Sequence, residues 1–276
     1  MPAGLRDVRS GLYSTPIPQE LVSMPENSLE LHPLSPHTVH PLSAWRWFMA
    51  GWKCYRSLPL ASSVYAAIYT VFGLTSGLFV WYVEALPMLF PLAMSFLLVG
   101  PIAATGFYQL SRTHRESGVP SLASAVRAWF GHASLWILAI LSGFLWLIWI
   151  TDAAILYGLY FGGSVDPGFL PRFGFTDTLP AFGVFASLMW LALGLIIFGV
   201  NAFSVPLLFE DRVSLPLAIG CSVRGILRNP VAMFGWAGLV VVVVLVSLAF
   251  PPLFLVALPV LAYGSEACYR EVYSEE

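Results

Sequence analysis

The chain has 276 residues, of which 58% are apolar or aromatic and 10% are charged. Because an ordinary soluble domain carries roughly 25% charged residues, this composition excludes a soluble protein. The net charge of -2, from 13 basic and 15 acidic residues, excludes a strongly basic nucleic-acid-binding face and an acidic tail. We therefore expect the lipid bilayer to be the solvent of this chain and expect no nucleic-acid partner.

The chain divides into residues 1–42 and residues 43–273. The first region is rich in proline, serine, glutamate and histidine and has no periodic apolar pattern, so it cannot bury enough surface to order itself. It is predicted to be a flexible cytoplasmic tail. The second region is predicted to be a membrane domain. Its first long apolar run begins only near Leu60, which indicates a retained anchor and not a signal peptide.

Six stretches of the second region are apolar over the length that a spanning helix needs, about 20 residues across roughly 30 Å of hydrocarbon. The six predicted spans are 60–82, 86–110, 133–161, 179–208, 231–250 and 253–269. Their apolar runs are continuous and do not alternate with polar residues, which favours helices over the strands of a barrel. The predicted fold is an all-α, polytopic membrane bundle of six transmembrane helices.

The positive charges predict the orientation of this bundle. Arg172 is the only basic residue on one side of the predicted spans, and the other Lys and Arg residues all fall on the opposite side. Basic residues concentrate in cytoplasmic segments, so this richer side is assigned to the cytoplasm. An even number of spans then places both termini there, in a multi-pass protein of the bacterial inner membrane.

Three shorter segments precede the first, third and fifth spans, at 43–57, 121–132 and 214–229. Each has apolar residues at helical spacing together with basic residues, and the first also carries Trp45 and Trp52. Tryptophan favours the headgroup level of a membrane. We therefore predict three amphipathic helices that lie in the cytoplasmic interface.

The same segments indicate a threefold internal repeat of one interfacial helix followed by two spans. Basic residues recur six positions before the starts of the first, third and fifth spans: Lys53 before Pro59, Arg127 before Ala133 and Arg224 before Pro230. The second and sixth spans also share the pattern P-x4-G-x5-R. Its matching residues are Pro101 and Pro259, Gly106 and Gly264, and Arg112 and Arg270. Three such units in parallel predict a pseudo-threefold bundle.

Three runs of the sequence carry a resemblance to a known family. They are LLVGPIAATGFYQLSR at 97–112, FEDRVSLPLAIGCSVRGILRNP at 209–230 and PVLAYGSEACYR at 259–270. Over about residues 43–273 the chain resembles a bacterial family of predicted six-helix integral membrane proteins of unknown function. Relatives tend to carry His and Trp near the end of the last span. This chain has Tyr263, Glu266 and Ala267 in that region, so no role of those side chains is carried over.

Members of that family are sometimes labelled as a cytochrome oxidase subunit, and the histidines test this label. A haem-copper core needs several intramembrane histidines as ligands. The five histidines lie in the tail, in a loop and at the start of the third predicted span. A catalytic oxidase subunit is therefore excluded, whereas an accessory subunit is not.

The candidate intramembrane polar site consists of Asp152 and Glu84. Asp152 is the only ionisable residue well inside a predicted span, and an intramembrane carboxylate is costly enough to suggest a function. The competing interpretation is a hydrogen-bonded Asp152 that faces the bundle interior, and we favour it. Glu84, at the outer end of the first span, is the only candidate partner for coupled proton movement.

A candidate cytoplasmic polar ring is predicted where the repeat makes several helix ends equivalent. Its members are Arg112, Glu210, Asp211, Arg212, Glu266 and Arg270. They form either an ion-pair network that closes the bundle or a polar site for a soluble ligand. We favour structural closure. Asn201, in the fourth predicted span, is expected to hydrogen-bond across helices as a packing device.

Small residues and cysteines give weaker signals. The patterns Gly73-x3-Gly77 and Gly158-x3-Gly162 allow close approach of helices, and we favour packing inside the chain over homodimerisation. The oligomeric state stays open. The three cysteines form no CxxC pair, so no disulfide framework is expected. The loose spacing of the tail histidines does not favour a metal site.

Enzyme signatures are missing from the sequence. It contains no HExxH motif, no Walker A lysine motif and no second intramembrane aspartate, so we predict no enzyme and no cofactor. The favoured hypothesis is a scaffold or accessory subunit whose interfacial helices bind lipid headgroups or another membrane protein. The alternative is a small-solute transporter or channel-like protein that uses Asp152 and the cytoplasmic ring.

Overall fold

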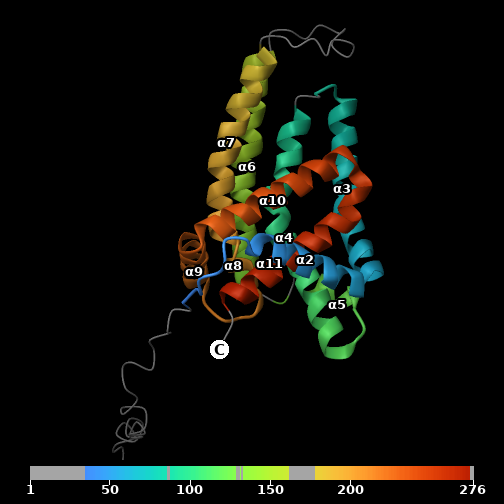
Figure 1. Cartoon of the computed structure of the whole chain (residues 1–276). Coiled ribbons are helices and arrows are strands. Elements are labelled where there is room, and N and C mark those ends of the chain that lie inside the picture. The colour runs from blue at the N-terminus through green and yellow to red at the C-terminus, as the bar shows by residue number, and fades with distance from the viewer. Residues whose placement is uncertain (1–34, 86–87, 129–130, 132, 162–177, 274–276) are drawn as a thin grey trace, which may run out of the picture. The chain divides into compact units, whose positions relative to one another are not determined.

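The computed structural model describes residues 35–85, 88–128, 131, 133–161 and 178–273, and the regular structure within these ranges is helical throughout (Figure 1). The helices are α2 (Ser43–Ser57), α3 (Pro59–Tyr82), α4 (Leu89–Ser117), α5 (Leu122–Arg127), α6 (Ala133–Phe161), α7 (Thr178–Asn201), α8 (Ser204–Phe209), α9 (Leu215–Arg228), α10 (Pro230–Ala249) and α11 (Phe254–Val272). A short 3-10 turn, η3 (Pro251–Leu253), joins the last two. The all-α prediction is confirmed.

Within the described residues, five helical stretches are long and apolar enough to cross a membrane. They are Pro59–Tyr82, Ala133–Leu159, Phe182–Phe209, Pro230–Ala249 and Pro251–Val272. α4 occupies the position of the second predicted span. The three predicted interfacial segments are α2, α5 and α9, although α5 is shorter than expected. The count of six spans stays a prediction.

Two helix boundaries differ from the predicted spans for local physical reasons. α4 continues past residue 110 into polar sequence, and it ends where Gly118 adopts a φ of 72°, a left-handed C-cap that glycine adopts without strain. The fourth span breaks after Asn201 into α7 and α8. The amide of Phe203 at this break donates to Ser222 Oγ of α9 at 3.1 Å, so the interruption leaves this donor satisfied.

α2 and α9 each turn directly into a long helix. One residue, Leu58, separates α2 from α3, and Asn229 likewise separates α9 from α10. Both long helices begin with proline, which is favoured at the first helical position because its missing N–H has no intrahelical partner there. This geometry holds α2 and α9 at the ends of the spans that follow them.

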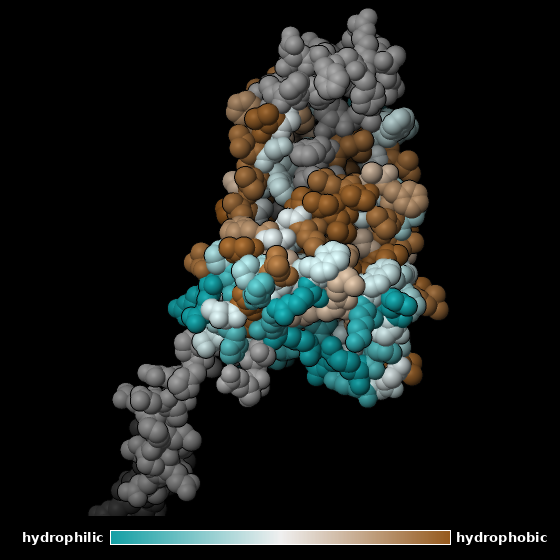
Figure 2. Space-filling view, in the orientation of Figure 1, coloured by the Kyte–Doolittle hydropathy of each residue, from teal (hydrophilic) through white to brown (hydrophobic). Residues whose placement is uncertain are grey.

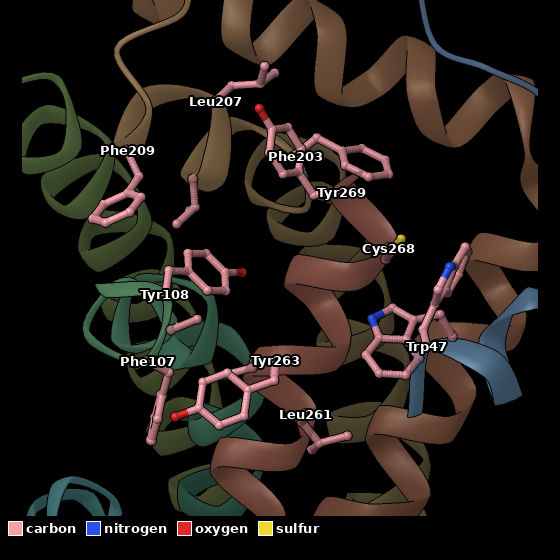
Figure 3. Packing of buried hydrophobic residues seen from close by; sticks show 14 of the residues in the cluster. Trp47, Phe107, Tyr108, Phe203, Leu207, Phe209, Leu261, Tyr263, Cys268 and Tyr269 are labelled. Atoms are coloured by element: carbon pink, nitrogen blue, oxygen red, sulfur yellow. The ribbon is translucent and has the colours of Figure 1, made fainter. Parts of the chain in front are cut away.

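α11 is the central helix of the bundle, because it packs against α2, α3, α4 and α10. Large aromatic side chains are buried where these helices meet, among them Trp47 of α2, Phe107 of α4 and Tyr263 of α11 itself (Figure 3). α6 and α7 form a long hairpin with a smaller core of their own around Trp149 and Phe182. The described surface is mostly apolar along the long helices and polar at the end that carries α2, α5 and α9 (Figures 1 and 2).

The three short helices pack in a cyclic pattern. α5 packs against α4, and α9 packs against α7 and α8, so each contacts the second long helix of the preceding predicted unit. α2 has no preceding unit and packs against α11, the last helix of the chain. Among the described helices, α2 therefore joins the first predicted unit to α11 of the third. The threefold repeat itself stays a prediction.

Close backbone approach occurs at glycines other than those the sequence suggested. A Cβ atom at Gly77 or Gly158 would meet no atom within 4 Å, so the prediction of tight packing inside the chain is wrong at both, and Gly162 lies outside the described residues. At Gly51 of α2 a Cβ would meet Val260 O and, at 2.8 Å, the backbone nitrogen of Gly264. α2 and α11 thus touch backbone to backbone.

Two of the predicted units share one contact at equivalent positions. Tyr65 stands six residues after Pro59 and packs where a Cβ of Gly106 would lie, and Trp236 occupies the same place with respect to Gly264. In both units an aromatic ring of the first long helix fills the space beside a glycine of the second. This shared contact supports common geometry in the first and third units.

Candidate functional site

The charged side chains gather at the polar end of the bundle, in what we call the polar layer. It consists of α2, α5, α8, α9 and the last turns of α4 and α11 (Figure 2). α11 supplies its centre, because Glu266, Tyr269, Arg270 and Glu271 all lie in the last turns of that helix. These side chains connect α11 to three other parts of the chain, namely α4, the segment after α8 and α2.

Glu266 is the most buried carboxylate of the polar layer, with 7% of its surface exposed. Its Oε1 accepts from Arg115 of α4 at 2.6 Å and from Arg270, one turn along α11, at 3.1 Å. Two guanidinium groups therefore neutralise and hydrogen-bond one carboxylate. Charge-assisted bonds of this kind are stronger than neutral ones, so the cluster ties α4 to α11.

A second cluster joins α11 to the segment after α8. Tyr269 donates its hydroxyl hydrogen to Glu210 Oε2 at 2.6 Å. Arg212 donates to the same hydroxyl at 3.0 Å and to the carbonyl oxygen of Tyr273 at 3.2 Å. Tyr273 in turn donates to the carbonyl oxygen of Cys221 on α9. Two tyrosines of the C-terminal segment thus connect α8, α9 and α11.

A third cluster joins α11 to α2. Glu271 Oε1 accepts from Arg46 at 2.7 Å and from the hydroxyl of Ser43, and its Oε2 accepts from the indole N–H of Trp47 at 2.7 Å. Arg46 is largely exposed, whereas Trp47 is buried. The indole bond satisfies a buried donor, and it fixes the rotation of α2 about its axis.

Residues 35–42, which the sequence assigned to the tail, are held against the polar layer. The side chain of Asn229 accepts from the amide of Val39 at 2.8 Å and donates to the carbonyl oxygen of His37 at 2.9 Å. The amide of His37 donates to the carbonyl oxygen of Val272 at 2.8 Å. This segment therefore crosses the α9–α10 junction and the end of α11.

The structure divides the predicted cytoplasmic ring into separate clusters. Glu266 and Arg270 lie together, as do Glu210 and Arg212. Arg112 forms an ion pair with Glu116 on the exposed face of α4, at 2.9 Å, and the ring as a single site stays a prediction. Asp211 adopts a left-handed φ of 51° in the turn after α8.

Arg115, the partner that α4 provides to Glu266, was not among the predicted residues, and neither were Tyr269 and Glu271. Arg115 follows Arg112 by three residues, so it projects from nearly the same side of the helix one turn further on. That spacing was the available signal. Which of the two arginines bonds to Glu266 depends on how α4 is rotated about its axis relative to α11, and only the packed structure shows that rotation.

Asp152 and Glu84 lie in different surroundings. Asp152 is partly exposed on α6, next to the buried residue Ala153 and three residues after the buried Trp149. Glu84 is exposed just after α3, with a left-handed φ of 57°. α6 packs against α4 and α7, and α3 packs against α4 and α11. The helix packing thus gives no sign that the two carboxylates act as a pair.

Polar side chains between the long helices are bonded to one another. Asn201 of α7 donates to Ser142 Oγ of α6 at 3.0 Å and to the carbonyl oxygen of Ile197 at 3.0 Å. The indole of Trp149 donates to the carbonyl oxygen of Pro91 on α4 at 3.0 Å. Asn201 thus bonds across helices as expected, and these bonds link α4, α6 and α7.

The three cysteines are free thiols, and within the described ranges no three potential metal-binding side chains come together. Cys54 lies on α2 near Glu266 and Arg115. Burial raises the pKa of the Cys54 thiol, and the carboxylate of Glu266 adds to the rise. Because the thiolate is the reactive form, this thiol is a poor nucleophile at neutral pH.

This environment predicts a pH-dependent labelling rate. At neutral pH we expect Cys54 to react with a water-soluble maleimide more slowly than a cysteine placed at exposed Ser57 in a Cys54→Ser background. A raised pKa keeps the thiol protonated, so the rate for Cys54 should continue to rise at a pH where that of the Ser57→Cys control has levelled. Mass spectrometry of the intact protein measures both rates. Identical pH profiles would contradict the described burial of Cys54.

Comparison with known proteins shows that part of this chain is similar to one family. Residues 89–210 match the model of a family described as "Predicted integral membrane protein (DUF2189)". No curated protein and no solved structure matches the chain. The matched segment runs from the start of α4 to Glu210, so it contains Asp152 but not Glu266 or Glu271. The chain is therefore a multi-pass integral membrane protein, similar over residues 89–210 to the DUF2189 family.

Proposed function

We propose that the protein is a non-enzymatic scaffold or accessory subunit of the bacterial inner membrane, with the polar layer and both termini in the cytoplasm. One observation carries this proposal. Glu210, Glu266 and Glu271 each bond to a side chain from a different part of the chain, and all three clusters include α11. Carboxylates used in this way fix the mutual positions of helices, which is what a binding platform requires.

The same observation weighs against acid–base catalysis in the polar layer. A general acid or base must exchange a proton with a substrate within hydrogen-bond reach. Glu266 is buried and already accepts from two arginines, and Glu271 accepts from an arginine and an indole. Freeing either group for a substrate would require breaking bonds that hold α2 or α4 on α11.

A small-solute transporter is the second candidate function, and the position of Asp152 favours it. This carboxylate lies well inside a long apolar helix, about two thirds of the way along it, and beside residues of α6 that are buried against other helices. Intramembrane carboxylates commonly line ion or proton pathways. The two candidates make opposite predictions for the effect of neutralising Asp152.

Partner capture tests the scaffold proposal. The full-length protein, affinity-tagged and extracted from its native membranes in a mild nonionic detergent, is expected to co-purify with another membrane protein in a fixed ratio. A Glu116→Gln variant, which changes an exposed residue of α4, serves as a surface control and should retain the partner. Isolation of the chain alone from membranes cross-linked before extraction would contradict the proposal.

Proton flux tests the transporter alternative. Liposomes that contain the purified protein and a pH-sensitive dye are expected to keep an imposed pH gradient as long as protein-free liposomes do. The Asp152→Asn variant should behave like the natural protein, because a carboxylate with a structural role moves no protons. If the natural protein dissipates the gradient and Asp152→Asn does not, the transporter replaces the scaffold as the favoured function.

A further inference from the structure

α2 has three distinct faces. Its buried face, on α11, includes Ala44, Trp47 and Gly51. A second face carries apolar and aromatic side chains that the rest of the chain leaves partly or fully uncovered. We call it the aromatic sector, and its members are Trp45, Phe48, Met49, Trp52 and Tyr55. The remaining face is polar and includes Arg46 and Lys53. Arg56, in the last turn of α2, is exposed and follows Trp52 by one turn.

The aromatic sector is too exposed for a helix surrounded by water. Trp45 is 62% exposed, Met49 45% and Trp52 38%. The rings are ordered in pairs, with centroids 5.6 Å apart for Trp45 and Phe48 and 5.8 Å apart for Trp52 and Tyr55. Adjacent exposed apolar side chains of this size indicate a surface that an apolar partner covers.

The aromatic sector is continuous with the apolar surface of the next span. The hydroxyl of Tyr55 lies 3.1 Å from Ser63 Oγ in the first turns of α3. On the same turns Leu60 is 78% exposed and Val64 47%. α3 is a candidate membrane span, so its exposed apolar side chains belong in lipid. The aromatic sector therefore lies at the edge of that lipid-facing surface.

α9 presents the same faces as α2. Its buried face includes Ala218, Cys221 and Ser222, and its exposed apolar face carries Val223 and Leu227. Arg224 and Arg228 form the basic face. At 3.6 residues per turn, the order around each helix is buried, apolar and basic, in the same rotational direction. Both helices also lead directly into a span, α3 or α10.

A shared order of faces has a geometric consequence. The cyclic packing of the short helices indicates that α2 and α9 run around the bundle in the same sense. Two such helices, each resting its buried face on the bundle, turn their apolar faces toward the same side and their basic faces toward the other. Amphipathic helices at a membrane surface have this arrangement, with apolar groups at the acyl boundary and Lys or Arg among the headgroups. A lipid leaflet fits both faces at once.

We propose that α2 and α9 lie in the headgroup layer of one leaflet and bind anionic phospholipids through Lys53, Arg56, Arg224 and Arg228. This inference deepens the proposed function, because it names a lipid partner for the polar layer. Within the described residues none of these four cations forms an ion pair with an acidic side chain, whereas Arg46 is paired with Glu271. Their charge is available to phosphate groups.

Spin labels on adjacent residues test the depth of α2. In a Cys54→Ser background, a label at Met49→Cys should be accessible to oxygen and protected from a water-soluble nickel complex. A label at Ala50→Cys, on the polar side, should show the opposite pattern. The Cys54→Ser protein without a new cysteine gives the background from the two buried thiols. Equal nickel accessibility at both positions would overturn the placement of α2.

Lipid selectivity tests the charge. Spin-labelled phosphatidylglycerol should associate with the reconstituted protein more strongly than spin-labelled phosphatidylcholine, measured as the motionally restricted fraction of each. Replacing Lys53 and Arg56, or Arg224 and Arg228, with Gln should reduce this preference by about fivefold per cation, from roughly 1 kcal/mol for each charge near an anionic surface. Arg112→Gln, which removes a charge paired with Glu116, should reduce it less.

The two proposals fail separately. Unchanged lipid selectivity in the Gln variants overturns lipid binding by α2 and α9, even if a protein partner is captured. A chain that is isolated alone but retains the lipid preference overturns the scaffold function and leaves the lipid inference standing. A third outcome concerns the label at Met49→Cys. If the nickel complex reaches this label in the protein alone but not in the protein bound to its partner, then a protein and not lipid covers the aromatic sector. That result would overturn the inference.

Discussion

Replacing Gly51 with alanine is expected to release α2 from α11. The added Cβ would meet Val260 O and the backbone nitrogen of Gly264, the latter at 2.8 Å, and backbone atoms cannot rotate away as a flexible side chain can. Overpacking of this kind costs about 1–3 kcal/mol, and the loss extends to the Trp47–Glu271 bond. The midpoint of thermal unfolding in detergent micelles, followed by tryptophan fluorescence, should fall, and Cys54 should label faster.

Gly77→Ala provides the matched control. This position also lies inside a helix, but a Cβ there meets no atom within 4 Å. Because alanine favours helix over glycine by roughly 0.5–1 kcal/mol, the control should retain or slightly raise the unfolding midpoint. An equal fall of the unfolding midpoint in both variants would show that replacing any glycine within a helix lowers the stability, and that the α2–α11 contact is not the cause. An unchanged midpoint in Gly51→Ala would contradict the backbone contact.

Replacing Arg115 with methionine is expected to destabilise the protein far more than replacing Arg112 with methionine. Arg115 donates to Glu266, which is 7% exposed, and its loss leaves a buried carboxylate with one of its two guanidinium partners. Hydrogen bonds to charged groups contribute about 1.5–3 kcal/mol. Since the Arg115 side chain is 46% exposed, solvent screening places the expected loss in the lower part of that range.

Arg112 is a matched control on the same helix, because its pair with Glu116 joins two exposed side chains four residues apart. Such pairs contribute about 0.3–0.5 kcal/mol. Added salt should reduce the stability loss of the Arg112 variant more than that of the Arg115 variant, because exposed ion pairs are screened more than buried ones. If both variants lose the same stability, measured by thermal unfolding at low and at high salt, Glu266 does not depend on Arg115.

Long-range features of this fold follow from composition, whereas contacts between helices do not. Continuous apolar runs require helices in lipid, so the sequence predicted the positions of α3, α6, α10 and α11 closely. α2 and α9 were predictable because each combines apolar spacing with basic residues and ends at a proline. The break between α7 and α8 was not, because it depends on a serine of α9 that bonds the freed amide of Phe203.

The polar layer shows the same limit in its charged residues. The repeat aligned Arg112 with Arg270, and Arg270 does bond to Glu266, but the residue of α4 that joins them is Arg115. The glycine patterns failed for a related reason: spacing identifies a smooth helix surface without saying whether a neighbour lies against it. Gly51 and Gly264 meet because α2 crosses α11 at their common position, and neither belongs to a glycine pair in the sequence.

The packing of α2 on α11 has a consequence for how the protein is made. α2 leaves the ribosome early, yet α11, the helix that covers Trp47 and Gly51, is made after all the other helices described here. The bundle therefore cannot be completed before α11 has been made, and the earlier helices must wait in the bilayer with this surface unfilled. Products truncated before α11 would keep that surface open, which makes them recognisable to membrane proteases that remove unfinished chains.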